Sequence, residues 1–212
     1  MKKLILVGAL ALCGAINAQE TRFGAKAGYS LSMLKAEYDN TTIESDGKST
    51  FYAGVLVEHK LNDQFALQAE VLYSPLGGKY VESESVAGFG YTYEADTKLG
   101  TVQVPVMAKY YVTENIALGA GVNFGLILSA DQDWSETIVS PEGTVTESGS
   151  EDIKDEVSSL NLAPFIGAEY NLENGLFFDA RYNMGVSNLV KDPTDGESMK
   201  LSFFQVGLGF KF

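Results

Sequence analysis

The chain of 212 residues is poor in the side chains that build most metal and redox sites, with one cysteine, one histidine and one tryptophan. The cysteine, Cys13, lies in a leader-like segment, so we expect no disulfide framework in the mature chain. Basic residues are also scarce: 15 Lys and Arg stand against 28 Asp and Glu, a formal net charge of -13. Because a nucleic acid must be met by clustered cations, this composition excludes it as a partner.

Long apolar runs are missing as well. The run "LILVGALALCGA" is too short to cross a bilayer as a helix. It follows Lys2 and Lys3 and precedes the small residue Ala18, which is the layout of a cleavable secretory signal. We therefore predict a signal peptide over residues 1–18 and a mature domain over 19–212. Acylation at Cys13 is the weaker alternative, because Leu12 stands where a lipoprotein signal needs a small residue.

The mature sequence instead shows strict alternation of apolar and other residues. In the clearest run, 116–128, the even positions are Ile, Leu, Ala, Val, Phe, Leu and Leu, while most of the odd positions are Gly or Asn. Eight such runs occur, at 22–34, 49–61, 65–74, 101–112, 116–128, 160–170, 176–187 and 203–212. Each is about long enough to cross a membrane as a tilted strand, and eight is the minimum for a closed transmembrane barrel.

The connections between these runs alternate between short and long. Tight hairpin turns are expected at "LND" (61–63), "TEN" (113–115) and "ENG" (173–175). The long connections are 35–48, 76–98, 129–158 and 190–200, and together they carry the whole formal charge. In the third, "ETIVSPEGTVTES" predicts two short strands around a Pro-Glu-Gly turn, a hairpin that projects above the membrane. This asymmetry is typical of an outer-membrane barrel with periplasmic turns, external loops and both termini in the periplasm.

Glycines and aromatics decide which face points inward. A soluble lipocalin-type barrel would turn its apolar face inward, but glycine recurs on the other face, where a narrow lumen needs small residues. These glycines are Gly24, Gly28, Gly54, Gly119, Gly121, Gly125, Gly167, Gly185, Gly207 and Gly209. Aromatics of the apolar face also sort into two levels, as expected for rings at two membrane interfaces. Tyr29, Phe51, Tyr73 and Phe204 belong to the loop end, and Phe23, Phe65, Tyr110, Tyr170, Phe178 and Phe210 to the turn end. We predict an all-β fold: an eight-stranded antiparallel up-and-down transmembrane β-barrel in the outer membrane.

Charged residues fall on the inward face, where opposite charges should pair because an unpaired buried charge is costly. The predicted lumen polar network is Lys26, Glu58, Glu70, Lys109, Glu169, Asp179 and Arg181, with Glu58, Glu70, Lys109 and Arg181 at its centre. The same parity also turns Arg22, Lys60 and Lys211 inward. A polar conduit or proton path is possible, but a salt-bridged plug is favoured because eight strands leave room for side chains and not for an open channel.

Catalysis and metal binding have little support. The one histidine, His59, stands beside the "LND" turn, whereas a hydrolase of outer-leaflet lipid would need it at the other end. We therefore expect no enzyme and no cofactor. "DQDWSE" (131–136) lacks EF-hand spacing, so a solvated acidic run is favoured there over divalent-cation binding. Trp134, Tyr91 and Tyr93 would either contact a partner or cap the barrel mouth.

Several segments carry a family resemblance. "FGAKAGYSLS", "FYAGVLVEHKLNDQFALQAEVLYSPLGGK", "VQVPVMAKYYVTENIALGAGVNFGLIL", "GLFFDARYNMGVSNL" and "FFQVGLGFKF" resemble the PorT-type outer-membrane β-barrel proteins, often labelled porin-family. The matching segments are wall and turn residues, so the resemblance implies a fold and supplies no catalytic or ligand motif. It also implies one function, a part in protein secretion across the outer membrane.

We predict a structural or interaction protein that presents acidic loops outside the cell. The alternative is a transport component, either a secretion accessory of PorT type or a small-solute porin. The expected partners are outer-membrane lipid, the outer-membrane assembly machinery, and a secretion complex or external protein. "FFQVGLGFKF" should pair with the first strand to close the barrel, since an open edge cannot persist in lipid. Its aromatics Phe210 and Phe212 resemble the signal that the assembly machinery reads.

Overall fold

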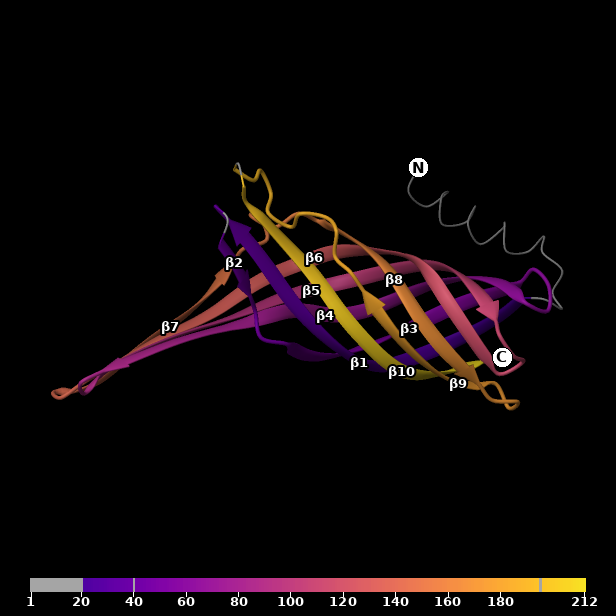
Figure 1. Cartoon of the computed structure of the whole chain (residues 1–212), viewed down its shortest axis with the longest axis horizontal. Coiled ribbons are helices and arrows are strands. Elements are labelled where there is room, and N and C mark those ends of the chain that lie inside the picture. Colours follow the sequence, from indigo (N-terminus) through magenta and orange to yellow (C-terminus); the bar gives the residue numbers. More distant parts are fainter. Residues whose placement is uncertain (1–20, 40, 195) are drawn as a thin grey trace.

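A computed structural model describes residues 21–39, 41–194 and 196–212. The predicted signal peptide, residues 1–18, lies outside them. The described chain is almost entirely β-structure (Figure 1). Its strands are β1 (Thr21–Tyr38), β2 (Thr41–Glu44), β3 (Lys48–Lys60), β4 (Phe65–Val86), β5 (Phe89–Tyr111), β6 (Ile116–Ser140), β7 (Gly143–Asp152), β8 (Leu160–Asn171), β9 (Leu176–Asn183) and β10 (Ser198–Lys211). No helix among these residues is long and apolar enough to span a membrane.

Eight of the ten strands form a closed antiparallel ring. Its order is β10-β9-β8-β6-β5-β4-β3-β1, and β1 pairs in turn with β10. The remaining two, β2 and β7, lie outside the ring and pair with β1 and β6. The predicted eight-stranded up-and-down barrel is confirmed, with β2 and β7 added to it.

The closing pair runs nearly the full length of both strands. Its register extends from Gly24 opposite Lys211 to Glu37 opposite Ser198. Beyond it, the backbone N–H of Phe212 donates to the carbonyl oxygen of Phe23 at 2.8 Å. The prediction that "FFQVGLGFKF" pairs with the first strand is confirmed, and each of the eight ring strands pairs with a neighbour on both sides.

Each short turn is held by a side chain of its own sequence. Asn62 Oδ1 accepts from the backbone N–H of Phe65 at 2.8 Å, Thr113 Oγ1 from Ile116 at 3.0 Å, and Asn174 Oδ1 from Leu176 at 3.1 Å. Such Asx and Thr turns stabilise the backbone reversal locally. The third turn also needs Gly175, whose φ of 90° lies in the region that side-chain-bearing residues avoid. All three predicted turns are confirmed and lie at one end of the barrel.

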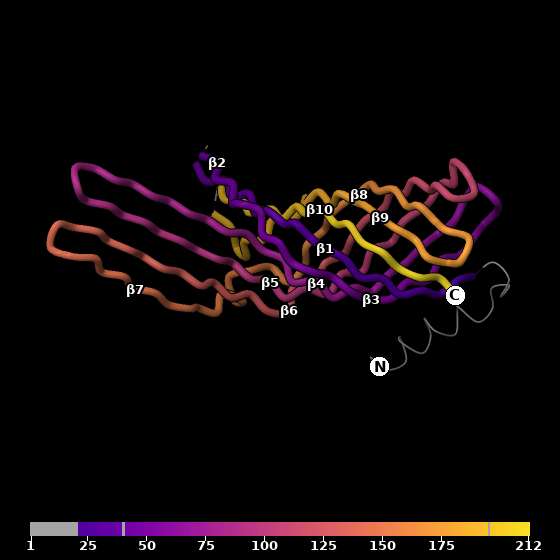
Figure 2. Tube along the Cα trace, turned by 90° about the horizontal axis from the view of Figure 1, so that it is seen from below, coloured from indigo at the N-terminus to yellow at the C-terminus, as the bar shows by residue number. Residues whose placement is uncertain are grey.

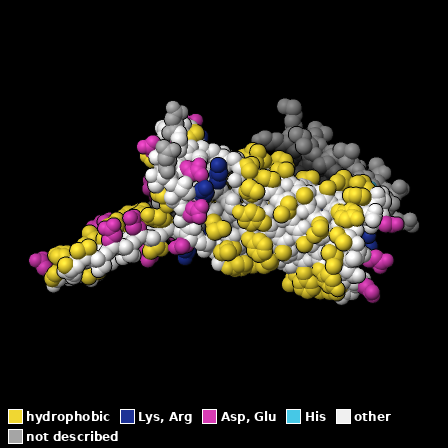
Figure 3. Space-filling model, in the orientation of Figure 1, with side chains coloured by type: hydrophobic (Ala, Val, Ile, Leu, Met, Phe, Trp, Pro, Cys, Tyr) yellow, Lys and Arg dark blue, Asp and Glu magenta, His cyan; other side chains and the backbone are white. Residues whose placement is uncertain are grey.

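The outer wall is apolar and the inner wall carries the glycines. Apolar side chains cover the barrel surface in Figure 3, and all ten aromatics expected on the outer face are exposed. Inside, a Cβ on Gly207 would collide with the hydroxyl of Tyr52, which is itself 1% exposed. The ring of Tyr52 therefore occupies the space that the glycine leaves open.

Strands β4, β5 and β6 do not stop at the barrel but continue outward with β7 as a four-stranded projecting sheet, visible in Figures 1 and 2. We define it as residues 78–86, 89–97, 132–140 and 143–151. The first of its two hairpins turns at Ala87 and Gly88, which have φ of 49° and 89°, as a two-residue hairpin turn of type I′ requires. The second turns at Pro141 and Glu142, so the hairpin predicted in the third connection is confirmed. The expectation that 76–98 is a loop is wrong, because residues 77–86 pair with residues 89–98 in unbroken register.

Candidate functional site

Two clusters of ion pairs fill the lumen from its turn end inward. The turn-end cluster consists of Glu58, Lys109, Glu169 and Lys211. Lys109 Nζ lies 2.6 Å from Glu58 Oε2 and 2.6 Å from Glu169 Oε1, and Lys211 Nζ lies 2.9 Å and 2.6 Å from the same two oxygens. The four residues come from β3, β5, β8 and β10, which are every second strand of the ring, so their charges alternate around the lumen. Each lysine therefore bridges both carboxylates.

The central cluster consists of Lys26, Glu70, Asp179 and Arg181. Arg181 donates to Glu70 through both terminal nitrogens, at 3.0 and 2.8 Å, and to Asp179 Oδ2 at 3.2 Å. Lys26 Nζ donates to the same Asp179 oxygen at 2.6 Å. Strands β9 and β4 stand opposite each other in the ring, so the Arg181–Glu70 pair crosses the lumen. Both clusters hold two cations and two carboxylates, which leaves no formal charge uncompensated in either.

The structure places all seven residues of the predicted network in the lumen and brings them together in these two clusters. It also adds residues that the network did not include. Lys211 completes the turn-end cluster, and Gln68 joins the clusters by accepting from Lys109 at 2.9 Å and donating to Glu70 at 2.6 Å. Tyr111 donates its hydroxyl to Glu58 at 2.9 Å. Their inward parity was readable in the sequence, but the partners of Lys211 and Tyr111 lie on strands that are not adjacent to their own in the ring.

Two cations expected inside belong to the mouth at the turn end. Arg22 is exposed there. It stands opposite Glu58 in the β1–β3 register, but the ion pairs of Glu58 are with Lys109 and Lys211. Lys60 lies with its Nζ 4.7 Å from the centroid of the Tyr111 ring. Arg22 and Lys60 line a recess of about 430 Å³ between the short turns. Arg22 therefore has the expected inward parity, because it pairs with Glu58 in the strand register, but it lies at the mouth and not among the buried ion pairs.

The loop end of the lumen is apolar, which corrects the expectation of a polar core throughout. Along β10 the inward side chains change from Lys211 at the turn end, through Gln205, to Phe203 and Leu201. We call the buried group at that end the apolar cap. Its members are Leu34, Leu76, Leu99, Ile127, Ala130, Val157, Ala163, Leu189, Leu201 and Phe203.

Two residues of the apolar cap lie between strands and not on them: Val157 between β7 and β8, and Leu189 between β9 and β10. Val157 and Val190 form an isolated β-bridge, and the backbone N–H of Ser158 donates to the Leu189 carbonyl oxygen at 2.8 Å. This contact carries Val157 and Leu189 into the mouth, where they are 3% and 0% exposed. Parts of the third and fourth connections therefore close the barrel from above.

The other chemical candidates do not gather into a site. His59 lies at the turn end, as expected, with Nδ1 2.9 Å from Thr21 Oγ1. Across residues 21–39, 41–194 and 196–212, no group of three or more His, Cys, Asp or Glu is arranged to hold a metal ion. Trp134, Tyr91 and Tyr93 belong to the projecting sheet, so the idea that they cap the mouth is wrong.

The projecting sheet has two unlike faces. Directly opposed residues share a face of a sheet, and one face includes a row made of hydroxyl side chains, Ser83, Thr92, Thr137 and Thr146. Its other rows hold further hydroxyl side chains together with Lys79, Glu94, Asp96, Asp133, Val81 and Val139. We call this the hydroxyl face. The other, which we call the aromatic face, has four rows: Tyr80, Ala95, Trp134 and Gly149; Glu82, Tyr93, Glu136 and Glu147; Glu84, Tyr91, Ile138 and Val145; Val86, Phe89, Ser140 and Gly143. Apolar and acidic side chains are both visible on this sheet in Figure 3.

A closed ring of strands, an apolar outer wall and charges sealed inside define an integral membrane β-barrel. The chain belongs to the family described as "Outer membrane protein beta-barrel domain", whose model matches residues 17–191. It is therefore a protein of the bacterial outer membrane, in contact with the lipid of that membrane. The search of curated proteins found no match.

Solved structures with a similar fold include Ail, the attachment invasion locus protein of Yersinia pestis, at 15% identity and a TM-score of 0.47, covering 91% of this chain and 99% of that one. Neisserial surface protein A is similar at 12% identity and a TM-score of 0.45, covering 90% and 97%. The outer membrane protein OprG from Pseudomonas aeruginosa is similar at 13% identity and a TM-score of 0.41, covering 91% and 96%.

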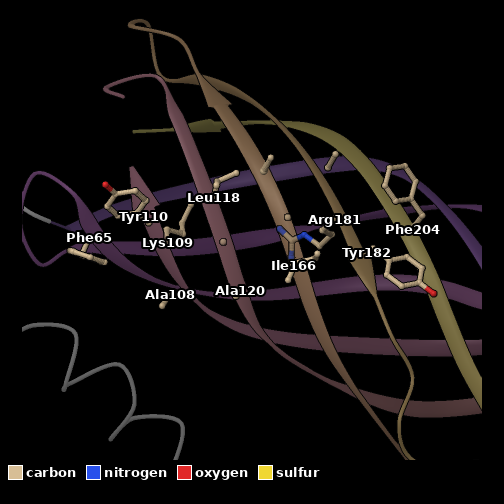
Figure 4. Close-up of a pocket in the computed structure, with 14 residues that line it drawn as sticks. Phe65, Ala108, Lys109, Tyr110, Leu118, Ala120, Ile166, Arg181, Tyr182 and Phe204 are labelled. Atoms are coloured by element: carbon tan, nitrogen blue, oxygen red, sulfur yellow. The ribbon is translucent and has the colours of Figure 1, made fainter. Parts of the chain in front are cut away.

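The wall itself carries a recess of about 700 Å³ on its lipid side (Figure 4). Its floor contains small residues, Ala108 and Ala120 among them, and its margin carries Tyr110, Tyr182 and Phe204. Since the chain lies in a membrane, this recess faces hydrocarbon and suits lipid acyl chains. Its lining also includes Lys109 and Arg181, whose side chains form the lumen ion pairs.

Proposed function

We propose that this protein is a closed outer-membrane barrel whose role is to present the projecting sheet to an external partner. The observation that carries the proposal is that the barrel is closed inside while three of its strands extend beyond it as a sheet. The lumen is crossed by ion pairs and covered by the apolar cap, whereas β4, β5 and β6 leave the wall without interruption to build the projecting sheet. The barrel then serves as an anchor, and the sheet is the functional surface.

The filled lumen supports this role over that of a small-solute porin. The interior of an eight-stranded barrel is just wide enough for side chains to fill it. Here ion pairs fill the lumen from the turn end to its centre, and aliphatic side chains fill the loop end. Recording from the purified protein in a planar bilayer should show no steady conductance at the scale of an open porin. A stable open channel of that size would refute the closed-barrel role.

Presentation is tested by shortening the sheet without touching the wall. Replacing residues 79–96 with a two-residue Asn-Gly turn leaves Gly78 opposite Thr97, and the same replacement of 133–150 leaves Gln132 opposite Glu151. The shortened barrel should insert and resist denaturation like the parent, as judged by heat-dependent gel mobility. It should lose adhesion or partner capture by whole cells, and retention of both would count against the proposed role.

The second candidate function is that of a secretion accessory of PorT type. Its support is the resemblance of the wall and turn segments, together with a projecting sheet that could contact other components at the cell surface. Deletion of the gene should then deplete the medium of exported proteins. An unchanged set of secreted proteins would exclude this candidate and leave the presentation role in place.

We further propose that the protein is not an enzyme and uses no cofactor. The placement of His59 at the turn end, against Thr21, supports this.

We also propose that the outer-membrane assembly machinery recognises the closing strand through Phe210 and Phe212. Their rings lie 5.6 Å apart on the outer face and are exposed. Substituting both phenylalanines with alanine should lower the amount inserted in cells more than it lowers the stability of protein refolded in detergent.

A further inference from the structure

The aromatic face of the projecting sheet exposes a large amount of apolar surface to water. Exposed fractions there reach 58% for Phe89, 48% for Ile138, 61% for Val145 and 73% for Val86. With four strands about 4.8 Å apart and four rows about 7 Å apart, the face measures about 300 Å² between its outermost residues, glutamates included. Exposed apolar side chains gathered on one face of a protein are commonly part of an interaction site.

Its charge is one-sided. The four rows contain the carboxylates of Glu82, Glu84, Glu136 and Glu147 and no lysine or arginine. Among the described residues, none of these four carboxylates lies within 4.0 Å of a basic side chain. Glu136 and Glu147 stand directly opposite each other on adjacent strands, an arrangement that destabilises a sheet. A cation bound between them would therefore relieve a repulsion built into the fold.

The rings and carboxylates alternate so that both can act on one cation. Tyr93 stands between Glu82 and Glu136 in its row, and Tyr91 stands between Glu84 and Ile138 in the next. The indole of Trp134 lies over Gly149, where a Cβ would be 2.9 Å from the ring. Burial, with the nearby carboxylates of Glu136 and Glu82, raises the pKa of Tyr91. Guanidinium and ammonium groups are attracted by ring faces and by carboxylates together.

Resting on the presentation role proposed above, we propose that the aromatic face binds a cationic, extended polypeptide segment, with arginine or lysine side chains between Tyr91, Tyr93 and the glutamates. In an extended segment, side chains two residues apart point the same way at a spacing of about 7 Å. That spacing matches the separation of successive rows. A segment with a basic residue at every second position therefore places one cation on each row.

Carbohydrate is the weaker occupant for this face. A neutral sugar would leave the repulsion between the opposed carboxylates of Glu136 and Glu147 in place, whereas a bound cation relieves it. Acidic surface polysaccharides would in addition be repelled by the glutamates. The small area predicts weak, salt-dependent association with a Kd of about micromolar or higher.

The test uses the full-length protein in detergent micelles with EDTA present. The probe is an end-blocked octapeptide of alternating Arg and Gly, and the comparison ligands are the same peptide with Glu for Arg and a neutral hexasaccharide. Because Trp134 is the single tryptophan and belongs to the aromatic face, its fluorescence reports binding directly. The cationic peptide should change that emission with a saturable Kd, and raising the salt from 50 to 500 mM should weaken it about tenfold or more.

A matched pair of variants distinguishes binding at the aromatic face from nonspecific attraction of the peptide to an acidic protein. The double variant Glu136→Gln and Glu147→Gln removes two charges from the aromatic face and should weaken peptide binding about tenfold. The control, Glu94→Gln with Glu142→Gln, removes two charges from the hydroxyl face and the tip turn and should change the Kd less than twofold. Equal weakening by both variants would overturn the proposal, as would equal binding of the anionic peptide or the hexasaccharide, or no binding of the cationic peptide at 1 mM.

Bilayer conductance of the same preparation tests the closed-barrel role independently of the proposed cationic partner. A closed barrel that fails to bind the cationic peptide would refute the cationic partner and leave the presentation role standing. A conducting barrel would refute the closed-barrel role whatever the peptide does.

Discussion

Replacing Arg181 with methionine should be among the most destabilising single changes in the barrel. Its guanidinium makes two hydrogen bonds to Glu70 and one to Asp179, and the side chains of Arg181 and Glu70 are 4% and 0% exposed. The variant leaves two buried carboxylates with Lys26 as the nearest remaining cation, 3.7 Å from Glu70. Removing one partner of such a buried pair costs about 3–5 kcal/mol, a large part of the stability of an ordinary domain, about 5–15 kcal/mol.

A second substitution tests whether the loss comes from charge. Adding Glu70→Gln to Arg181→Met leaves Lys26 and Asp179 as a balanced pair at 2.6 Å. The double variant should therefore lie within about 2 kcal/mol of the parent, so that Glu70→Gln recovers about 1 kcal/mol or more of the loss caused by Arg181→Met. As a surface control, Lys35→Met breaks the exposed Lys35–Glu37 pair and should cost about 1 kcal/mol or less.

The assay is urea-induced unfolding in lipid vesicles, followed by far-UV circular dichroism and by heat-dependent gel mobility. Tryptophan emission is unsuitable for the wall because Trp134 reports the projecting sheet. A loss for Arg181→Met that equals the loss for the Lys35 control would refute the reasoning, since the lumen pairs would then contribute no more than surface pairs. If the double variant is as unstable as Arg181→Met, the loss of unfolding free energy comes from lost packing of the arginine side chain and not from an unpaired charge.

Three further outcomes are expected. Leu201→Ala in the apolar cap should lower the unfolding free energy by about 2–5 kcal/mol while the barrel stays closed to ions, and an unchanged unfolding curve would contradict the cap. Gly207→Ala should cost about 1–3 kcal/mol because the new methyl meets the Tyr52 hydroxyl, and adding Tyr52→Phe should recover part of that loss in the same unfolding assay. Hydrogen bonding by Lys98 lowers the pKa of Asp133, so Lys98→Met should raise it in an NMR titration. The small stabilisation from this pair should be present above the unfolded-state pKa of Asp133 and be lost as the pH falls through the lower folded-state pKa, and an unmoved Asp133 titration would exclude the contact.

The ring of strands could be predicted because lipid and lumen impose opposite demands on alternate residues. In 116–128 that contrast is nearly complete, and the strand, its face and its turn all agree with the structure. Residues 76–98 gave no such signal because both faces of their hairpin meet water, so Tyr91 and Thr92 alternate without either being buried. Periodicity reports a buried face, and the projecting sheet has none.

The sequence predicted which residues face the lumen, but not which of them contact one another. Parity alone turns Leu76, Leu99 and Leu201 inward, but it does not say at which height the interior changes from charged to aliphatic. The partners of Lys211 depend on which strands face each other across the ring, and that follows from closure rather than from any local pattern. Val157 enters the cap from a connection, where no periodicity marks it.

The unbroken course of β4, β5 and β6 has a mechanical consequence. The ten residues of β7, at about 3.3 Å each, carry the tip about 33 Å from the barrel mouth, a distance similar to the roughly 30 Å thickness of the hydrocarbon layer. Measured along the strands, a partner bound at the tip is thus separated from the barrel mouth by about one bilayer thickness. The β4–β5 ladder runs from tip to wall in one register, and the β5–β6 ladder does so with one register shift between Gly100 and Thr101. A pull on that partner therefore loads the strands in shear as far as the barrel wall.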